Sequence, residues 1–162
     1  MDDWIELAFS VFAQMPGPIE HEAGIPVADG WLAPALVRSG GIELWVAGVS
    51  DATLRRAART GVWHPVALPP AQLSELAARF RERRPAGRVV LRLTALFSDE
   101  PDPRCLDERG RHTVAGPPQW IAERLAEYVE GGCNGFVVNL GHEAPGLEER
   151  VQRFAEEVWP PV

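Results

Sequence analysis

The sequence predicts an α/β protein of about four βα units, which is half of an eightfold barrel. From residue 42 onward, apolar strand-like segments alternate with amphipathic segments of helical length, and this alternation is typical of βαβ units with a parallel sheet. The chain has 162 residues, whereas a complete (β/α)8 barrel takes about 250. We therefore expect a single domain, 1–162, in which residues 1–41 lead into the βα units of 42–162.

The lead-in begins with a predicted helix over residues 4–12. Its apolar residues recur at helical spacing and share one face: Trp4, Ile5, Ala8, Val11 and Phe12. Residues 16–41 are rich in glycine and proline, which indicates a loop. We expect one short extended piece in it, at residues 25–27.

The first βα unit begins with an apolar strand at residues 42–46. A glycine turn follows, and then a helix from Asp51 to Arg59 with Ser50 as its N-cap. The start of such a helix has unpaired N–H groups and the positive end of the helix dipole, which together can hold a phosphate. The same turn also occurs without a ligand in α/β proteins, so both interpretations stay open. A second short strand is predicted at residues 62–66.

The next unit begins with a helix from Pro69-Pro70 to Arg84, because proline is favoured in a first helical turn. Its buried stripe is expected to be Leu73, Leu76, Ala77 and Phe80. Residues 88–97 are rich in β-branched and large apolar side chains and predict the third strand. We expect residues 98–115 to form a polar loop.

The last part of the chain holds two helices and a strand. One helix opens at Gly116-Pro117-Pro118, runs to about Glu130 and ends at Gly131-Gly132. Its expected inward residues are Ile121, Leu125, Ala126 and Val129. The fourth strand is predicted at residues 135–140, and the last helix at about 146–158.

Polar side chains follow three of the predicted strands, where barrels place their active sites. They are His64, Asp99, Glu100, His142 and Glu143. Such groups could converge as an acid/base pair, or they could be loop residues that never meet. No HxH or HxxxH spacing occurs, so no metal site is expected. Arg88 and Arg92 alternate with apolar residues on the third strand. They could meet an acidic cofactor tail at the barrel mouth, or mark a sheet face without helices.

Composition excludes several classes of function. A net charge of −7 argues against nucleic acid as a partner, because phosphate binding needs a basic surface. No apolar run approaches the length of a membrane span, and the first residues carry acids where a signal peptide would carry bases. We expect a cytoplasmic protein in which Cys105 and Cys133 are reduced thiols.

Four segments resemble the luciferase-like monooxygenases. Residues 45–58 are similar to the family pattern W-V-G-G-x-S-x-x-A-L-R-R-A-A, and Trp63-His64-Pro65 is similar to its G-W-H-P. Residues 116–128 resemble its G-x-P-E-Q-V-A-E-R-L helix start, and residues 153–160 its closing R-F-A-E-E-V-x-P. The family is built on a TIM barrel, so the resemblance implies a partial TIM barrel, the C-terminal half, with strands five to eight.

The resemblance implies a flavin- or deazaflavin-dependent oxidoreductase or monooxygenase. Such an enzyme would transfer hydride or activate oxygen on a small organic substrate, once assembled as an oligomer. The implied cofactor is FMN or the 8-hydroxy-5-deazaflavin coenzyme F420. Gly48, Val49, Ser50 and Arg92 are the expected cofactor-binding residues, and His64 is the candidate catalytic residue. Asp51 departs from this picture, because its charge at the helix start would repel a phosphate.

Two other functions stay open: a non-catalytic subunit that binds a cofactor or a partner, and a remnant without activity. Bound yellow colour and hydride transfer would separate the three. A free half-barrel would also leave two unpaired edge strands and an exposed apolar face. We expect a homodimer to cover them, since it hides the most apolar surface without another component. A complementary half-barrel subunit, or cover by residues 16–41, would serve the same purpose.

Overall fold

A computed structural model describes residues 17–18, 31–32, 43–141 and 145–159. The chain divides into two compact units, Met1–Leu44 and Trp45–Val162. In the first unit, β1 (Gly17–Pro18) pairs antiparallel with β2 (Trp31–Leu32). The helix expected at residues 4–12 and the extended piece expected at 25–27 lie outside the described residues.

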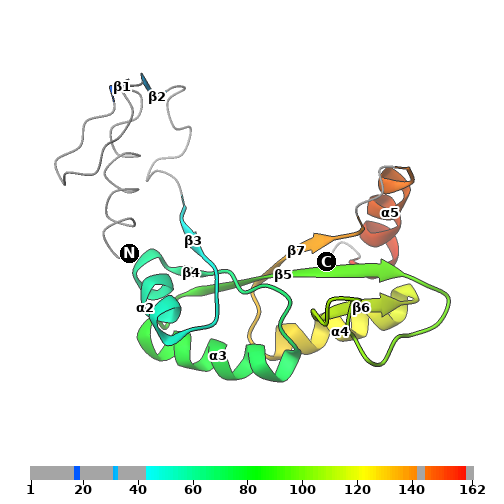
Figure 1. Cartoon of the computed structure of the whole chain (residues 1–162), viewed down its shortest axis with the longest axis horizontal. Coiled ribbons are helices and arrows are strands. Elements are labelled where there is room, and N and C mark those ends of the chain that lie inside the picture. Colours follow the sequence, from blue (N-terminus) through cyan, green and yellow to red (C-terminus); the bar gives the residue numbers. More distant parts are fainter. Residues whose placement is uncertain (1–16, 19–30, 33–42, 142–144, 160–162) are drawn as a thin grey trace. The chain divides into compact units, whose positions relative to one another are not determined.

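The second unit is a curled parallel sheet with helices, which confirms the predicted α/β half-barrel (Figure 1). Its strands are β3 (Trp45–Val46), β4 (Val62–Trp63), β5 (Arg88–Phe97), β6 (Thr113–Gly116) and β7 (Gly135–Asn139). Its helices are α2 (Asp51–Thr60), α3 (Pro70–Arg83), α4 (Pro118–Glu130) and α5 (Leu147–Arg153). The last of these continues as a π-helical turn, η1 (Phe154–Val158).

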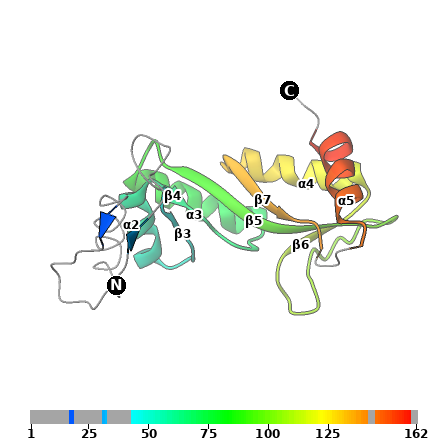
Figure 2. The same ribbon diagram turned by 90° about the horizontal axis from the view of Figure 1, so that it is seen from above.

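The long strand β5 lies in the middle of the sheet, with other strands paired along both of its sides (Figures 1 and 2). Arg92 of β5 pairs with Val66, just beyond β4, on one side and with Val137 of β7 on the other. Thr94 likewise has β6 on one side and β7 on the other. The four-strand path is therefore β3-β4-β5-β7, and β6 lies beside the last part of β5, on the same side as β4.

Alternation along β5 separates two faces of the sheet. Val89, Leu91, Leu93 and Ala95 are buried in the hydrophobic core with residues of α2, α3 and α4. Of the alternate residues, Arg88, Arg92 and Leu96 are exposed, Thr94 is partly buried and Val90 is buried. Because side chains of a strand alternate between its two sides, these exposed residues lie on the opposite side, which we call the open face.

Several boundaries agree closely with the prediction. The strand expected at residues 88–97 is β5, residue for residue. All four residues of the stripe expected on α3 are buried. Ser50 caps α2, and its Oγ accepts a hydrogen bond from Thr53 N at 3.2 Å.

Two predictions about the chain after residue 97 are wrong. The stretch 98–115 is not only a loop, because Thr113–Gly116 forms β6 along the end of β5. On α4, Ala126 and Val129 are exposed, and Tyr128 is buried in their place. The hydroxyl of Tyr128 donates to Leu68 O at 2.7 Å. A tyrosine ring can be buried in a core when its hydroxyl has a hydrogen-bond partner there. The buried face of α4 therefore includes Tyr128 and leaves out Ala126 and Val129.

The loop before β6 contains a half-buried histidine with a pH-dependent contribution to stability. Burial lowers the pKa of His112 from its ordinary 6.5, so the unfolded chain binds this proton more readily than the folded one. Stability must then fall as the pH drops below about 6.5. Urea unfolding at about pH 8 and about pH 5 should show a smaller acid-induced loss for His112→Asn than for the wild type. An unchanged loss would mean that other groups dominate the acid response.

No helix in residues 43–141 and 145–159 is long and apolar enough to cross a bilayer. Within the same residues, no three His, Cys, Asp or Glu side chains are grouped so that they could hold a metal ion.

Candidate functional site

A cleft of about 630 Å³ lies in the second unit. Its lining comes from β3, β5, β7, α5, the residue after β4 and the two residues after β7: Trp45, His64, Arg92, Val137, Val138, Asn139, Leu140, Gly141, Leu147 and Val151. The walls are therefore mainly apolar, with one guanidinium, one imidazole and one side-chain amide. Ligand pockets typically combine such apolar walls with a few convergent polar groups.

His64 is held in one orientation by the strand beside it. Its Nδ1 lies 2.6 Å from Val90 O. A carbonyl oxygen only accepts hydrogen bonds, so Nδ1 is the protonated nitrogen that donates. In the neutral ring, Nε2 then carries the lone pair. Trp45 lies against the imidazole, with ring centroids 5.1 Å apart. The cleft thus presents an oriented histidine whose Nε2 can accept a proton or a hydrogen bond.

Arg92 is fixed through its backbone at the centre of the sheet. Its N–H donates to Pro65 O and its carbonyl accepts from Ala67 N, both at 2.9 Å. In the part of the chain that the structure describes, no acidic side chain forms an ion pair with its guanidinium. An anchored, uncompensated guanidinium in a cleft is suited to a phosphate or carboxylate, which it can bind through two parallel hydrogen bonds.

The anchoring segment includes one strained residue. Ala67 has a φ of 52°, in the left-handed region that costs a residue with a Cβ about 1–2 kcal/mol. Glycine removes this cost but adds chain entropy to the unfolded state, about 0.4–1 kcal/mol. We expect Ala67→Gly to raise the free energy of unfolding by about 0.5–1 kcal/mol. A urea melt that shows a loss instead would mean that the methyl group of Ala67 packs better than its backbone geometry suggests.

The other predicted cofactor residues lie outside the cleft. Gly48, Val49 and Ser50 form the turn before α2, and none of them is in the cleft lining. Gly48 has a φ of 116°, and its carbonyl accepts from Trp63 Nε1 at 2.8 Å. Ser50 Oγ serves the helix cap and lies 2.9 Å from Thr53 Oγ1. The structure therefore brings His64 and Arg92 together but does not bring this turn to them.

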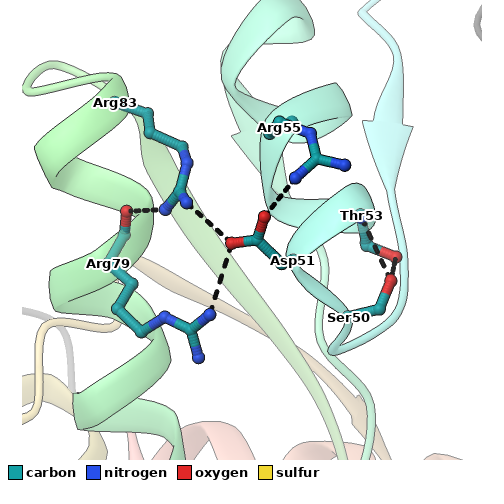
Figure 3. A network of polar contacts seen from close by, with 6 residues as sticks. All are labelled: Ser50, Asp51, Thr53, Arg55, Arg79 and Arg83. Atoms are coloured by element: carbon teal, nitrogen blue, oxygen red, sulfur yellow. Dashed lines mark hydrogen bonds and ion pairs between the residues drawn. The ribbon is translucent and has the colours of Figure 1, made fainter.

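Asp51 is surrounded by arginines, as Figure 3 shows. Its carboxylate forms ion pairs with Arg55 of α2 and with Arg79 and Arg83 of α3, the last two at 3.3 and 2.6 Å. Three positive charges face one negative charge, so the carboxylate is more than offset. From the sequence, Asp51 was expected to make this helix start repulsive to anions. That expectation did not include the three arginines around its carboxylate. Its structural effect is to join α2 to α3.

The acids expected near the site do not line the cleft. Asp99 and Glu100 are exposed beyond β5 and are absent from the cleft lining. His142 and Glu143 lie outside the described residues. Eight of the ten lining residues were not predicted from the sequence: Trp45, Val137, Val138, Asn139, Leu140, Gly141, Leu147 and Val151. One signal was available, since Leu147 and Val151 are spaced i, i+4 on one helix face.

No protein-family model and no curated protein matches the chain. Solved structures do match. An F420-dependent secondary alcohol dehydrogenase, in complex with an F420-acetone adduct, has a TM-score of 0.68 at 12% identity. A riboflavin lyase with modified FMN and riboflavin has 0.64 at 15%. The EDTA monooxygenase from Chelativorans sp. BNC1 has 0.60 at 19%.

These matches cover most of this chain but only part of each neighbour. They span 96%, 97% and 89% of this chain, and 59%, 55% and 49% of the respective neighbours. The chain thus spans about half the length of the proteins it resembles. At these identities the likeness shows the fold alone, a curled parallel α/β half-barrel that corresponds to part of each neighbour.

Proposed function

We propose that this chain is the coenzyme-binding half of a luciferase-like oxidoreductase or monooxygenase. It would use FMN or F420 to transfer hydride, or to activate oxygen, on a small organic substrate once assembled as an oligomer. The observation that carries the proposal is the cleft, where an uncompensated Arg92 and an oriented His64 face apolar walls. The fold supports it, because the neighbours' names include an F420-dependent dehydrogenase and a lyase with modified FMN.

The residues of the cleft fit such a coenzyme. A volume of about 630 Å³ is within the usual range of small-molecule sites, about 300–1,000 Å³. Apolar side chains from Val137, Leu147 and Val151 suit a flat, largely apolar ring system. Arg92 suits the phosphate that FMN and F420 both carry. We do not assign a role to Gly48, Val49 or Ser50 in this cleft.

The protein's share of the chemistry is to bind and orient. When bound, the coenzyme supplies hydride transfer, or in the flavin case the reduction of oxygen, which no side chain can supply. The guanidinium of Arg92 would bind an anionic group of the coenzyme, and the backbone of Arg92 is held by its hydrogen bonds to Pro65 and Ala67. His64 would accept a hydrogen bond or a proton at Nε2, with Nδ1 committed to Val90 O. The apolar walls would exclude water from the bound ring.

One observation favours a second candidate, a subunit that binds the coenzyme without turnover. His64 is the one lining residue, among those the structure describes, whose side chain can serve as a general acid or base. A cleft with a single such group can bind without catalysing. Binding without hydride transfer or oxygen consumption, over a panel of small alcohols and amines, would assign this function instead.

An equilibrium titration tests the proposal. Purified protein is titrated with FMN and with F420, and the intrinsic fluorescence of each ligand is followed. We expect a dissociation constant in the micromolar range for one of them, about −8 kcal/mol. If a protein with a cooperative unfolding transition binds neither ligand at millimolar concentration, the coenzyme-binding proposal fails.

A further inference from the structure

A short bend over residues 65–68, between β4 and α3, runs beside Arg92. Arg92 N donates to Pro65 O, and Ala67 N donates to Arg92 O, each at 2.9 Å. Val66, between them, is the bridge partner of Arg92 in the sheet. Both backbone polar groups of Arg92 are thus paired with the bend, whose position determines where this cleft residue lies.

The bend has few hydrogen-bond donors of its own. Residues 65–70 include three prolines, Pro65, Pro69 and Pro70, and a proline has no backbone N–H. Ala67 has a φ of 52°, a left-handed conformation that persists only where the surrounding structure enforces it. Contacts from other elements must therefore keep the bend in its observed conformation.

Tyr128 of α4 provides such a contact. Its hydroxyl donates to Leu68 O at 2.7 Å, and both atoms are buried. The ring packs on two other rings, with its centroid 6.3 Å from that of Phe136 and 6.2 Å from that of His112. Burial raises the pKa of Tyr128 well above its ordinary value, so the hydroxyl remains a donor at neutral pH.

We propose that Tyr128 is a positioning residue for the coenzyme site and acts on Arg92 through the bend. Without the hydroxyl, Leu68 O has no donor in a buried place, which costs free energy. A shift of the bend would bring that oxygen to water and would also relieve the strain at Ala67. The same shift would break the hydrogen bonds of Pro65 and Ala67 with Arg92, so the guanidinium would no longer be held in the cleft. The effect on ligand affinity rests on the proposed function, whereas the contact of Tyr128 with the bend does not.

Any buried hydrogen bond contributes to stability, so the test needs a control with the same chemical change elsewhere. Thr113 is buried, and its Oγ1 donates to Thr94 O at 3.0 Å. Thr94 lies two residues beyond Arg92 on β5, so this hydrogen bond is close to the site but does not involve the bend. Tyr128→Phe and Thr113→Val each remove one buried hydroxyl and keep the rest of the side chain nearly unchanged.

Amide hydrogen exchange in the ligand-free chain tests the contact without the coenzyme. In Tyr128→Phe we expect the N–H groups of Ala67 and Arg92 to exchange about tenfold faster than in the wild type, through local opening. The reference is Asn134, whose N–H donates to a carbonyl of β5 at 2.8 Å and should change less. In Thr113→Val, the two amides should show no acceleration beyond that of Asn134. If Tyr128→Phe changes all three amides by the same factor, or Thr113→Val opens the bend as much, the proposal is overturned.

Titration with FMN and with F420 then measures the effect on the site. We expect Tyr128→Phe to raise the dissociation constant about threefold to tenfold, and Thr113→Val to leave it within about twofold of the wild type. In an Arg92→Ala background, Tyr128→Phe should cause no further loss, because it acts through Arg92. An unchanged affinity despite an open bend, or an undiminished loss in that background, would contradict the proposal. If the wild type binds neither ligand, the proposed function fails, while the exchange rates still decide whether Tyr128 holds the bend.

Discussion

Replacing Arg92 with alanine should weaken coenzyme binding by about tenfold to a hundredfold. A hydrogen-bonded charge pair is worth about 1.5–3 kcal/mol, and each 1.4 kcal/mol changes a dissociation constant about tenfold. The side chain lies on an exposed face, so its loss leaves the core intact. The measurement is the titration with FMN or F420, repeated on Arg92→Ala.

Arg88→Ala is the matched control for this variant. Arg88 lies on the same strand and the same face, four residues earlier, but it does not line the cleft. Both variants remove one positive charge, so a long-range electrostatic effect would be similar in both. We expect Arg88→Ala to bind within about twofold of the wild type. Equal losses in the two variants would contradict a direct contact between Arg92 and the ligand.

The second large effect is on folding: Trp63→Ala should lower the free energy of unfolding by about 3–5 kcal/mol. The side chain is fully buried and packs on Phe80, with ring centroids 6.2 Å apart. Its Nε1 also donates to Gly48 O at 2.8 Å, which ties β4 to the turn before α2. Because the free energy of unfolding of a domain is about 5–15 kcal/mol, this loss would remove a large part of the stability. Urea unfolding measures it.

Trp63→Phe separates packing from the hydrogen bond. Phenylalanine keeps most of the aromatic contact with Phe80 but leaves the carbonyl of Gly48 without its donor. We expect a smaller loss of about 1–3 kcal/mol. If Trp63→Ala costs less than Trp63→Phe, or less than about 1 kcal/mol, Trp63 does not join the two elements in the way described.

Composition and spacing along the chain predicted the elements that depend mainly on local sequence, such as β5 and the buried stripe of α3. Residues 88–97 were predicted as a strand, and form β5, because β-branched and large apolar side chains are enriched in strands. The four residues of β6 carry no such run. They form a strand because the end of β5 offers a free side there, which depends on tertiary structure. The wrong prediction that Val129 faces inward has the same origin. Helical periodicity alone does not indicate that the hydroxyl of Tyr128 donates to Leu68 O.

The candidate site was predictable only in part. His64 was identified because it follows a predicted strand, where barrels place their active sites, and Arg92 because it alternates with apolar residues on the third strand. The apolar walls were not, because Trp45, Val137 and Val151 come from three segments that only the folded sheet brings together. The environment of Asp51 was missed for a similar reason. Arg79 and Arg83 approach it from a different helix, and no spacing in the sequence indicates that contact.

Amide chemical shifts locate a bound coenzyme in the cleft most directly. Labelled protein is titrated with FMN and with F420 and followed by two-dimensional NMR. We expect the largest shifts on Arg92, His64 and residues 137–141, while Gly48, Val49 and Ser50 change little. Shifts concentrated on the turn before α2, with Arg92 unchanged, would place the ligand at the helix start and contradict a coenzyme site in the cleft.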